Sequence, residues 1–321
     1  MIFQETFDTF KQTLLADSRT QLCEVSFGGG ALVGLAEKSF ASKLESFARE
    51  HRIGFKVNFL EASTQYVSSG RAFLKKSPDA KAEVVSEAIY GEEVRVYNKQ
   101  GNFCRVATAR DSYFGWMSVA DLGHNVPPAT HHFNAPRGHV FASPSVASER
   151  LFELAYGSFL HVVKQEGEWC KVELSRVKGY VRGSLLQASS EQSPVNAKAV
   201  IALATKFLEA PYVWGGTTAW GLDCSGLVQT VYGAYRISLP RDADQQAETG
   251  EVVGLEDVKA ADLIFFPGHV ALSLGGPKII HANAQHMRVT IDDFEKTHYA
   301  KGLKEQITGV KRLLKGGTHE T

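Results

Sequence analysis

The sequence predicts an α+β protein in which a small mixed N-terminal segment and two small β-barrels precede a larger C-terminal domain. Residues 70–123 and 134–188 match each other at a constant offset of 66 positions, in short alternating runs typical of small barrels. Over residues 195–315, segments of helical period come first and strand-like segments follow, which is the order of an α+β domain. Residues 1–69 form the mixed α/β segment, and the sequence assigns them no role.

The composition argues against several classes of function. The chain has 321 residues, and its 35 acidic residues balance 35 basic ones, which gives no reason to expect nucleic acid or an anionic membrane as a partner. The first residues lack a secretory signal and no segment is long and apolar enough to span a membrane, so we expect a cytoplasmic protein. We expect a small or neutral partner and neither metal nor cofactor, and the oligomeric state stays open.

The N-terminal segment shows two helical patterns and one strand. Apolar residues at helical spacing predict helices over 6–15 and 40–48, and residues 21–27 alternate like a strand. Gly28 to Gly30 invite comparison with a nucleotide-binding loop, but their spacing is not that of the dinucleotide fingerprint. We therefore expect a turn there, followed by the start of a helix.

The repeat continues without a gap through both barrels, which indicates a duplicated domain. Matched positions include Ser77-Pro78 with Ser143-Pro144, Tyr90-Gly91 with Tyr156-Gly157, and Cys104 with Cys170.

The connector between the barrels, residues 123–136, is rich in His, Pro and Asn. His124, His131 and His132 could be taken for a metal cluster, but no pattern of supporting residues accompanies them. We expect a solvated loop here.

Cys224 is the candidate nucleophile. It follows a polar linker over 189–194, a helical segment that stops at Pro211, and Gly-rich chain, and it precedes apolar residues of helical period. Its sulfur should therefore lie at a helix N-terminus, where unpaired N–H groups and the helix dipole stabilise a thiolate. The other three cysteines are far apart in the sequence, so free thiols are expected. The alternative for Cys224 is a buried, inert thiol.

Two histidines complete the set of candidate catalytic residues. His269 begins a strand-like run that a Gly-Gly turn connects to a second run ending at His281, which predicts a hairpin with the two imidazoles as near neighbours. We expect His269 on the face with Ala271 and Ser273, and the helix of Cys224 packed against that face. His269 would then serve as general base, His281 would orient it, and the Cys224 amide with a group from the Tyr212 loop would bind the oxyanion.

Several motifs in this C-terminal domain resemble those of the NlpC/P60 cysteine peptidases. They are Pro211-Tyr212-Val213-Trp214-Gly215-Gly216, Leu222-Asp223-Cys224-Ser225-Gly226, Leu239-Pro240-Arg241-Asp242, Gly268-His269-Val270-Ala271 and Ile280-His281. The resemblance implies a papain-like fold and cleavage of peptide stems of the bacterial cell wall. It also places Cys224, His269 and His281 on the catalytic positions, with Asp223 and Ser225 beside the nucleophile. The barrels resemble bacterial SH3-type domains, as in Phe114-Gly115-Trp116-Met117.

Tandem SH3-type domains before such a domain resemble the dipeptidyl-peptidase branch, the γ-D-glutamyl-L-diamino acid endopeptidases that recycle released wall peptides. That resemblance implies a substrate with free N-terminal L-Ala, whose amine is recognised by Tyr113 and an acid, with Glu83 and Glu87 as candidates. Further substrate contacts are expected at Asp223, Ser225, Tyr212, Trp214, Arg241 and Asp242. Ala243 departs from the pattern, because a substrate-contacting serine is often found there.

Two other functions stay open at this stage. A papain-like domain with the same residues could perform acyl transfer or deamidation on another substrate. The chain could instead be a non-catalytic wall-binding protein whose function is carried by the barrels. The choice between meso-diaminopimelate and lysine as the diamino acid is not indicated by any motif.

Overall fold

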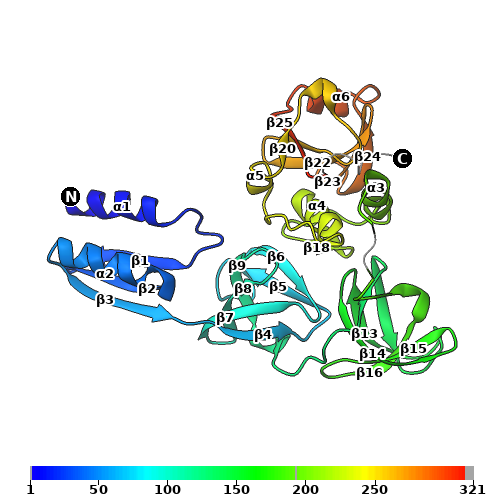
Figure 1. The fold of residues 1–321 in the computed structure, drawn as a ribbon, viewed down its shortest axis with the longest axis horizontal. Helices are drawn as coiled ribbons and strands as arrows, with labels where there is room; N and C mark the ends of the chain where they lie inside the picture. Colours follow the sequence, from blue (N-terminus) through cyan, green and yellow to red (C-terminus); the bar gives the residue numbers. More distant parts are fainter. Residues whose placement is uncertain (1, 192–193, 315–321) are drawn as a thin grey trace.

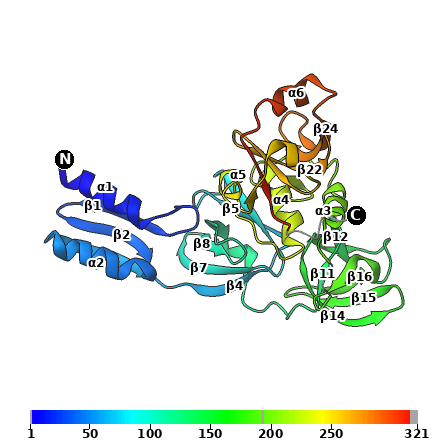
Figure 2. The ribbon, with the colours of Figure 1, turned by 45° about the horizontal axis from the view of Figure 1, so that its top comes forward.

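The computed structural model describes residues 2–191 and 194–314. The N-terminal domain and the two barrels lie in a row, with the C-terminal domain above the barrels (Figures 1 and 2). Two linker residues, 192 and 193, and the predicted end of the C-terminal domain at 315 lie outside the described residues. Within the described part, none of the helices combines the length and the apolar character needed to cross a bilayer.

The N-terminal domain is a three-stranded sheet in the order β1-β2-β3, covered by two helices. Its elements are α1 (Ile2–Leu14), β1 (Cys23–Gly28), β2 (Ala31–Glu37), η1 (Lys38–Phe40), α2 (Ala41–Glu50) and β3 (Gly54–Leu60). Strand β2 corrects one expectation, because the turn at Gly29 and Gly30 leads into a strand and not into a helix. Both glycines have positive φ, which closes a tight hairpin that pairs β1 with β2.

The first barrel begins earlier than the sequence indicated. Its strands are β4 (Ser63–Val67), β5 (Arg71–Lys75), β6 (Val84–Ile89), β7 (Glu93–Gln100), β8 (Phe103–Thr108), β9 (Phe114–Ser118) and, after η2 (Val119–Asp121), β10 (Leu122–Gly123). Strand β4 pairs with β7 and β10 inside the barrel sheet, although it falls within the segment assigned to the N-terminal region.

The second barrel has the same topology as the first. Its elements are β11 (His131–Phe133), β12 (Arg137–Phe141), β13 (Arg150–Ala155), β14 (Phe159–Glu166), β15 (Trp169–Glu173), β16 (Lys178–Arg182), η3 (Gly183–Leu185) and β17 (Leu186–Ala188). The order β17-β11-β14-β15-β16-β12-β13 corresponds strand by strand to β10-β4-β7-β8-β9-β5-β6. His131 and His132 lie in β11 and pair with β14 and β17, so the expectation of a solvated loop was wrong for these two residues.

The C-terminal domain has helices before an antiparallel sheet, as predicted. Its elements are α3 (Ala197–Thr205), β18 (Thr217–Thr218), β19 (Gly221–Leu222), α4 (Cys224–Gly233), α5 (Ala243–Gln246), β20 (Glu251–Val252), η4 (Leu255–Asp257), β21 (Leu263–Phe266), β22 (His269–Gly275), β23 (Lys278–Asn283), β24 (Arg288–Asp293), α6 (His298–Lys304) and β25 (Gly309–Arg312). The sheet order is β20-β25-β21-β22-β23-β24.

Helix α4 packs on the sheet face opposite to the expected one. Its Leu227 and Val231 share a core with Val270 and Leu272 of β22. The other face, which carries Ala271, is covered by α6. The alternation of side chains along β22 correctly sorted them into two faces. It could not show which face packs against α4, because both faces are buried. Each fully buried Leu or Val side chain in this core contributes about 1.5–3 kcal/mol to folding.

Candidate active site

Helix α4 begins at Cys224. A side-chain cap fixes its first turn, and the loop before it packs closely against the first barrel. The side chain of Asp223 accepts a hydrogen bond from the Gly226 N–H at 2.7 Å, which caps the helix. Gly215, just before, has φ +78°, and a Cβ there would lie 2.5 Å from the Val84 carbonyl oxygen of the first barrel. A residue with a side chain would therefore push the barrel away from the nucleophile's loop.

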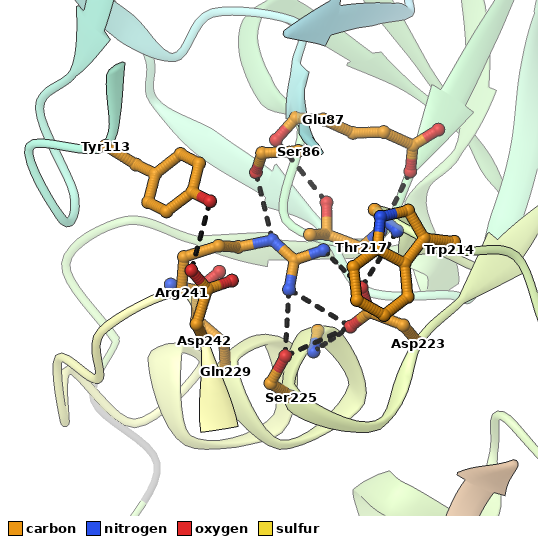
Figure 3. A network of polar contacts seen from close by, with 12 residues as sticks. Ser86, Glu87, Tyr113, Trp214, Thr217, Asp223, Ser225, Gln229, Arg241 and Asp242 are labelled. Carbon is orange, nitrogen blue, oxygen red and sulfur yellow. Dashed lines mark hydrogen bonds and ion pairs between the residues drawn. The ribbon is translucent and has the colours of Figure 1, made fainter. Parts of the chain in front are cut away.

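A buried ion pair lies beside the nucleophile (Figure 3). Arg241 donates from Nη1 and Nη2 to the two carboxylate oxygens of Asp223, at 3.0 and 2.6 Å, and from Nη1 to Ser225 Oγ at 2.9 Å. The Arg241 side chain is 1% exposed, so the expected contact between Arg241 and a substrate is corrected. The guanidinium instead holds the two residues that flank Cys224 in place.

The first barrel takes part in this network. Ser86 Oγ accepts a hydrogen bond from Arg241 Nε at 3.1 Å. Glu87 is buried and accepts from the Thr217 N–H at 2.9 Å and the Thr218 hydroxyl at 3.1 Å. Glu87 is one of the two candidate acids for amine recognition. Its carboxylate instead accepts the hydrogen bonds that connect the barrel to the β18–β19 hairpin.

Cys224 is 8% exposed, and its environment favours the thiol over the thiolate. Burial raises the pKa of the Cys224 thiol to about 11, and the carboxylate of Asp223 adds to the rise. The backbone N–H groups of Val270 and Ser225 oppose the rise without cancelling it. The helix N-terminus therefore does not produce the resting thiolate expected from the sequence, and the proton must leave Cys224 as the sulfur attacks.

This protonation state predicts the pH dependence of alkylation. With a pKa of about 11, the thiolate fraction at pH 7 is about 10⁻⁴ and rises tenfold per pH unit. We expect the rate at which iodoacetamide labels Cys224 to rise about tenfold per unit from pH 7 to pH 10, measured by mass spectrometry of the Cys224 peptide. A rate already constant between pH 6 and 8 would show a preformed thiolate and contradict this prediction.

The two histidines form a relay with an acid that the sequence analysis missed. His269 Nε2 lies 2.8 Å from His281 Nδ1, and His281 Nε2 lies 2.9 Å from Asp292 Oδ2. The strand register pairs Leu272 of β22 with Ile280 of β23, and His281 is the next residue of β23 toward His269, as the hairpin predicted. His281 is fully buried, and the hydrogen bond from His281 holds the pKa of Asp292 below its usual range.

The ionised Asp292 determines which ring nitrogen of His269 can act as a base. A carboxylate only accepts hydrogen bonds, so His281 Nε2 carries a proton, and in neutral His281 the Nδ1 atom is then an acceptor. His269 therefore donates from Nε2, which leaves the lone pair on Nδ1 available to accept a proton. Burial and the neighbouring His281 lower the pKa of His269 to about 3, so its imidazole is neutral and able to accept.

Replacing Asp292 with asparagine is expected to lower kcat by about 10- to 100-fold with KM little changed. Asparagine can also donate a hydrogen bond, so it no longer selects one tautomer, and it removes the charge that stabilises the protonated relay. Steady-state kinetics would measure the effect. Asp293→Asn, the next residue of β24, is the matched control and should retain the wild-type kcat. Equal kcat in both variants would contradict a positioning role for Asp292.

A cavity of about 540 Å³ opens beside Cys224. Predicted residues that line it are Glu83, Tyr113, Trp214, Asp223, Cys224, Ser225 and Asp242. The phenol of Tyr113 donates to Asp242 Oδ2 at 3.0 Å (Figure 3). Trp214 Nε1 donates to Glu83 Oε1 at 3.0 Å. The cavity therefore joins the nucleophile to two carboxylates, one from the first barrel and one from the C-terminal domain.

Ala243, at the position where a substrate-contacting serine was expected, also lines the cavity. The remaining cavity residues were not proposed as site residues from the sequence: Ser18, Arg19, Lys76, Val85, Arg105, Phe114, Asp244 and Gly268. Ser18 and Arg19 belong to the N-terminal domain, more than 200 positions before Cys224, and no local pattern marks them. The sequence indicated Asp292 only weakly. It lies two residues after Thr290 in the strand that follows His281, so the two side chains share one face of that strand. Among the described residues, no group of three or more His, Cys, Asp or Glu side chains is arranged to hold a metal.

Tyr212 lies close to the nucleophile. Burial and then the proximity of Cys224 raise the pKa of Tyr212 to about 12, so its phenol stays protonated and can donate a hydrogen bond. The first N–H groups of α4 have no partner within the helix. A carbonyl carbon attacked by Cys224 would therefore have the Cys224 N–H and the Tyr212 hydroxyl as donors for its oxygen.

Three family models match the chain. The NlpC/P60 family matches residues 209–308, the bacterial dipeptidyl-peptidase SH3 domain matches residues 74–122, and the bacterial SH3 domain matches residues 137–187. The three matches cover the C-terminal domain and both barrels, and all begin after the N-terminal domain.

The chain is similar to known proteins over most of its length. A γ-D-glutamyl-L-lysine dipeptidyl-peptidase of Bacillus subtilis (strain 168) is 31% identical over 238 residues, which cover 68% of this chain and 79% of that protein. Dipeptidyl-peptidase 6 of Lysinibacillus sphaericus is 27% identical over 262 residues, which cover 76% and 97%. A solved NlpC/P60 family protein of Bacillus cereus ATCC 10987 has a TM-score of 0.70 and 24% identity, covering 79% of this chain and 100% of that chain. The chain therefore belongs to the NlpC/P60 family of cysteine peptidases, with bacterial SH3 domains before its peptidase domain.

Proposed function

We propose that the chain hydrolyses the bond between γ-D-glutamate and a diamino acid in wall stem peptides that carry a free N-terminal L-Ala. The observation that carries this proposal is the shared cavity, in which Glu83 and the Tyr113–Asp242 pair face the same space as Cys224. Carboxylates that line a cleft suit an ammonium group. The similarity to a γ-D-glutamyl-L-lysine dipeptidyl-peptidase supports the bond type.

In the proposed mechanism, the Cys224 sulfur attacks the γ-carbonyl carbon of D-glutamate while the thiol proton passes to Nδ1 of His269. The Cys224 N–H and the Tyr212 hydroxyl stabilise the resulting oxyanion. The carbon–nitrogen bond then breaks, and His269 gives its proton to the amine of the leaving diamino acid. Water, activated by His269, attacks the thioester, so that L-Ala-D-Glu leaves and Cys224 regains its proton.

The diamino acid in this proposal is meso-diaminopimelate or lysine, and the peptides are those released when the wall is recycled. A cytoplasmic location belongs to the same proposal. Comparing kcat/KM for L-Ala-γ-D-Glu-meso-diaminopimelate and L-Ala-γ-D-Glu-L-Lys would identify the preferred diamino acid.

Recognition of the substrate's N-terminal amine is tested by acetylating that amine. We expect N-acetyl-L-Ala-γ-D-Glu-meso-diaminopimelate to be cleaved with a kcat/KM at least about 10²-fold below that of the free peptide. Acetylation removes the positive charge of the amine and with it the ion pair that the amine would form with the partly buried carboxylate of Asp242. Product release measured by chromatography provides the readout. Equal cleavage of both peptides would exclude recognition of the amine.

A further inference from the structure

The loop between α1 and β1 brings the N-terminal domain into the cavity of Cys224. Figure 1 shows this loop extending from α1 toward β9 of the first barrel. The Phe114 N–H donates to the Arg19 carbonyl oxygen at 2.7 Å, and Leu22 packs against Ala107 and Phe114. Ser18 and Arg19 consequently line the same cavity as the nucleophile.

Arg19 holds together three carboxylates from two domains. Its Nη1 donates to Asp242 Oδ2 at 2.9 Å and to Asp244 Oδ1 at 2.8 Å. Its Nη2 donates to Asp17 Oδ2 at 2.7 Å and to Asp244 Oδ2 at 2.8 Å, and its Nε donates to Asp17. A guanidinium has five N–H donors, and these contacts use all of them. Arg19 therefore has no donor left for a substrate and can act on a substrate only through the carboxylates.

Asp17 is itself fixed to the peptidase domain. Gln245 of α5 donates from Nε2 to Asp17 Oδ2 at 2.7 Å. The hydrogen bonds from Arg19 lower the pKa of Asp17 to about 2, so Asp17 is a full negative charge at neutral pH. The loop is thus tied at Asp17 and Arg19 to the N-terminal end of α5, directly after Asp242.

The cluster sets three carboxylates around the guanidinium of Arg19. Burial raises the pKa of Asp242, and the Arg241 guanidinium, the hydrogen bond from Tyr113 and Arg19 oppose that rise, so Arg19 helps to keep Asp242 in the charged form that can pair with an ammonium group. Asp242 is the member that also accepts from Tyr113, and its side chain is 27% exposed. Without Arg19, the three carboxylates would repel one another, and each would resist ionisation.

We propose that Arg19 is a specificity-determining positioning residue, through which the N-terminal domain fixes Asp242 to receive the ammonium group of the substrate's N-terminus. This inference rests on the proposed function and adds a part of the chain that all three family matches leave out. Arg19 of the N-terminal domain and Tyr113 of the first barrel both donate to the same oxygen of Asp242.

The test compares Arg19→Met with the wild type on L-Ala-γ-D-Glu-meso-diaminopimelate and on its N-acetylated form. We expect KM for the free peptide to rise roughly tenfold while kcat stays within about twofold, because the chemistry at Cys224 is untouched. The acetylated peptide should keep its wild-type kcat/KM. Arg19→Lys should recover part of the loss, since lysine keeps the charge without the planar fork. Arg49→Met, at an exposed position of α2 in the same domain, is the matched control.

An unchanged or lower KM for the free peptide in Arg19→Met would overturn the inference, and so would an equal loss with both peptides, which would indicate a general structural defect. Calorimetric titration with the dipeptide L-Ala-γ-D-Glu and its N-acetylated form needs no turnover. If the wild type cleaves neither tripeptide, the proposed function fails, whereas Arg19 is still judged by whether Arg19→Met weakens binding of the free dipeptide alone.

Discussion

Replacing Cys224 with alanine is expected to lower kcat for the free L-Ala-γ-D-Glu peptide by at least about 10⁴-fold, with substrate binding retained. The cavity and its carboxylates do not depend on the sulfur, whereas no other nucleophile is proposed at this position. Single-turnover and steady-state kinetics would give kcat, and calorimetric titration would give the dissociation constant of the uncleaved peptide.

Two other cysteines provide matched controls for this variant. Cys104 and Cys170 are buried at equivalent positions of the two barrels, each 6% exposed. Cys104→Ala and Cys170→Ala are expected to keep kcat within about twofold of the wild type, because neither sulfur reaches the cavity residues. Hydrolysis that survives in Cys224→Ala would disprove the proposed mechanism.

The barrels were predictable because a duplicated sequence must bury the same core twice. Cys104 and Cys170, for example, occupy β8 and β15, which hold the same place in the two strand orders. The start of the first barrel was not predictable in the same way. Strand β4 is short and only its last residue, Val67, is buried, so its sequence carries little alternation to detect.

The two histidines of the candidate site show where periodicity stops being informative. It placed His269 and His281 on one face of a hairpin, which the register and the 2.8 Å contact agree with. It assigned α4 to that face because Ala271 and Ser273 are small, but Ala271 packs against α6. A strand buried on both sides gives no difference in polarity from which to choose.

Charged residues far apart in sequence were the hardest to place. Arg241 belongs to a motif of the site, and the motif did not indicate that its buried side chain pairs with Asp223 and does not line the cavity. Arg19 meets Asp242 across 223 positions, through a loop whose local sequence predicts only a connection between a helix and a strand. Such contacts follow from how domains dock, which a single sequence does not encode in any local pattern.

Replacing Arg241 with methionine is expected to lower the free energy of unfolding by about 3–5 kcal/mol. Methionine fills much of the volume but leaves the Asp223 carboxylate buried without its counter-ion, 8% exposed and next to Cys224. It also removes the hydrogen bond from Arg241 Nε to Ser86, which joins the first barrel to this site. Urea unfolding followed by circular dichroism would measure the change.

Two controls distinguish the effect of leaving the Asp223 charge buried from the effect of losing the Arg241 side chain. One is a variant at a surface ion pair, and the other is a double variant. Arg182 pairs with Glu168 at the surface, where the two side chains are 45% and 80% exposed, so Arg182→Met should change the unfolding free energy by less than about 1 kcal/mol. Adding Asp223→Asn to Arg241→Met removes the unpaired charge while asparagine can still cap α4. The double variant should therefore be more stable than Arg241→Met by at least about 1 kcal/mol. If it is less stable than the single variant, the loss comes from packing and capping, and the ion pair does not hold the nucleophile's helix in the way that its geometry indicates.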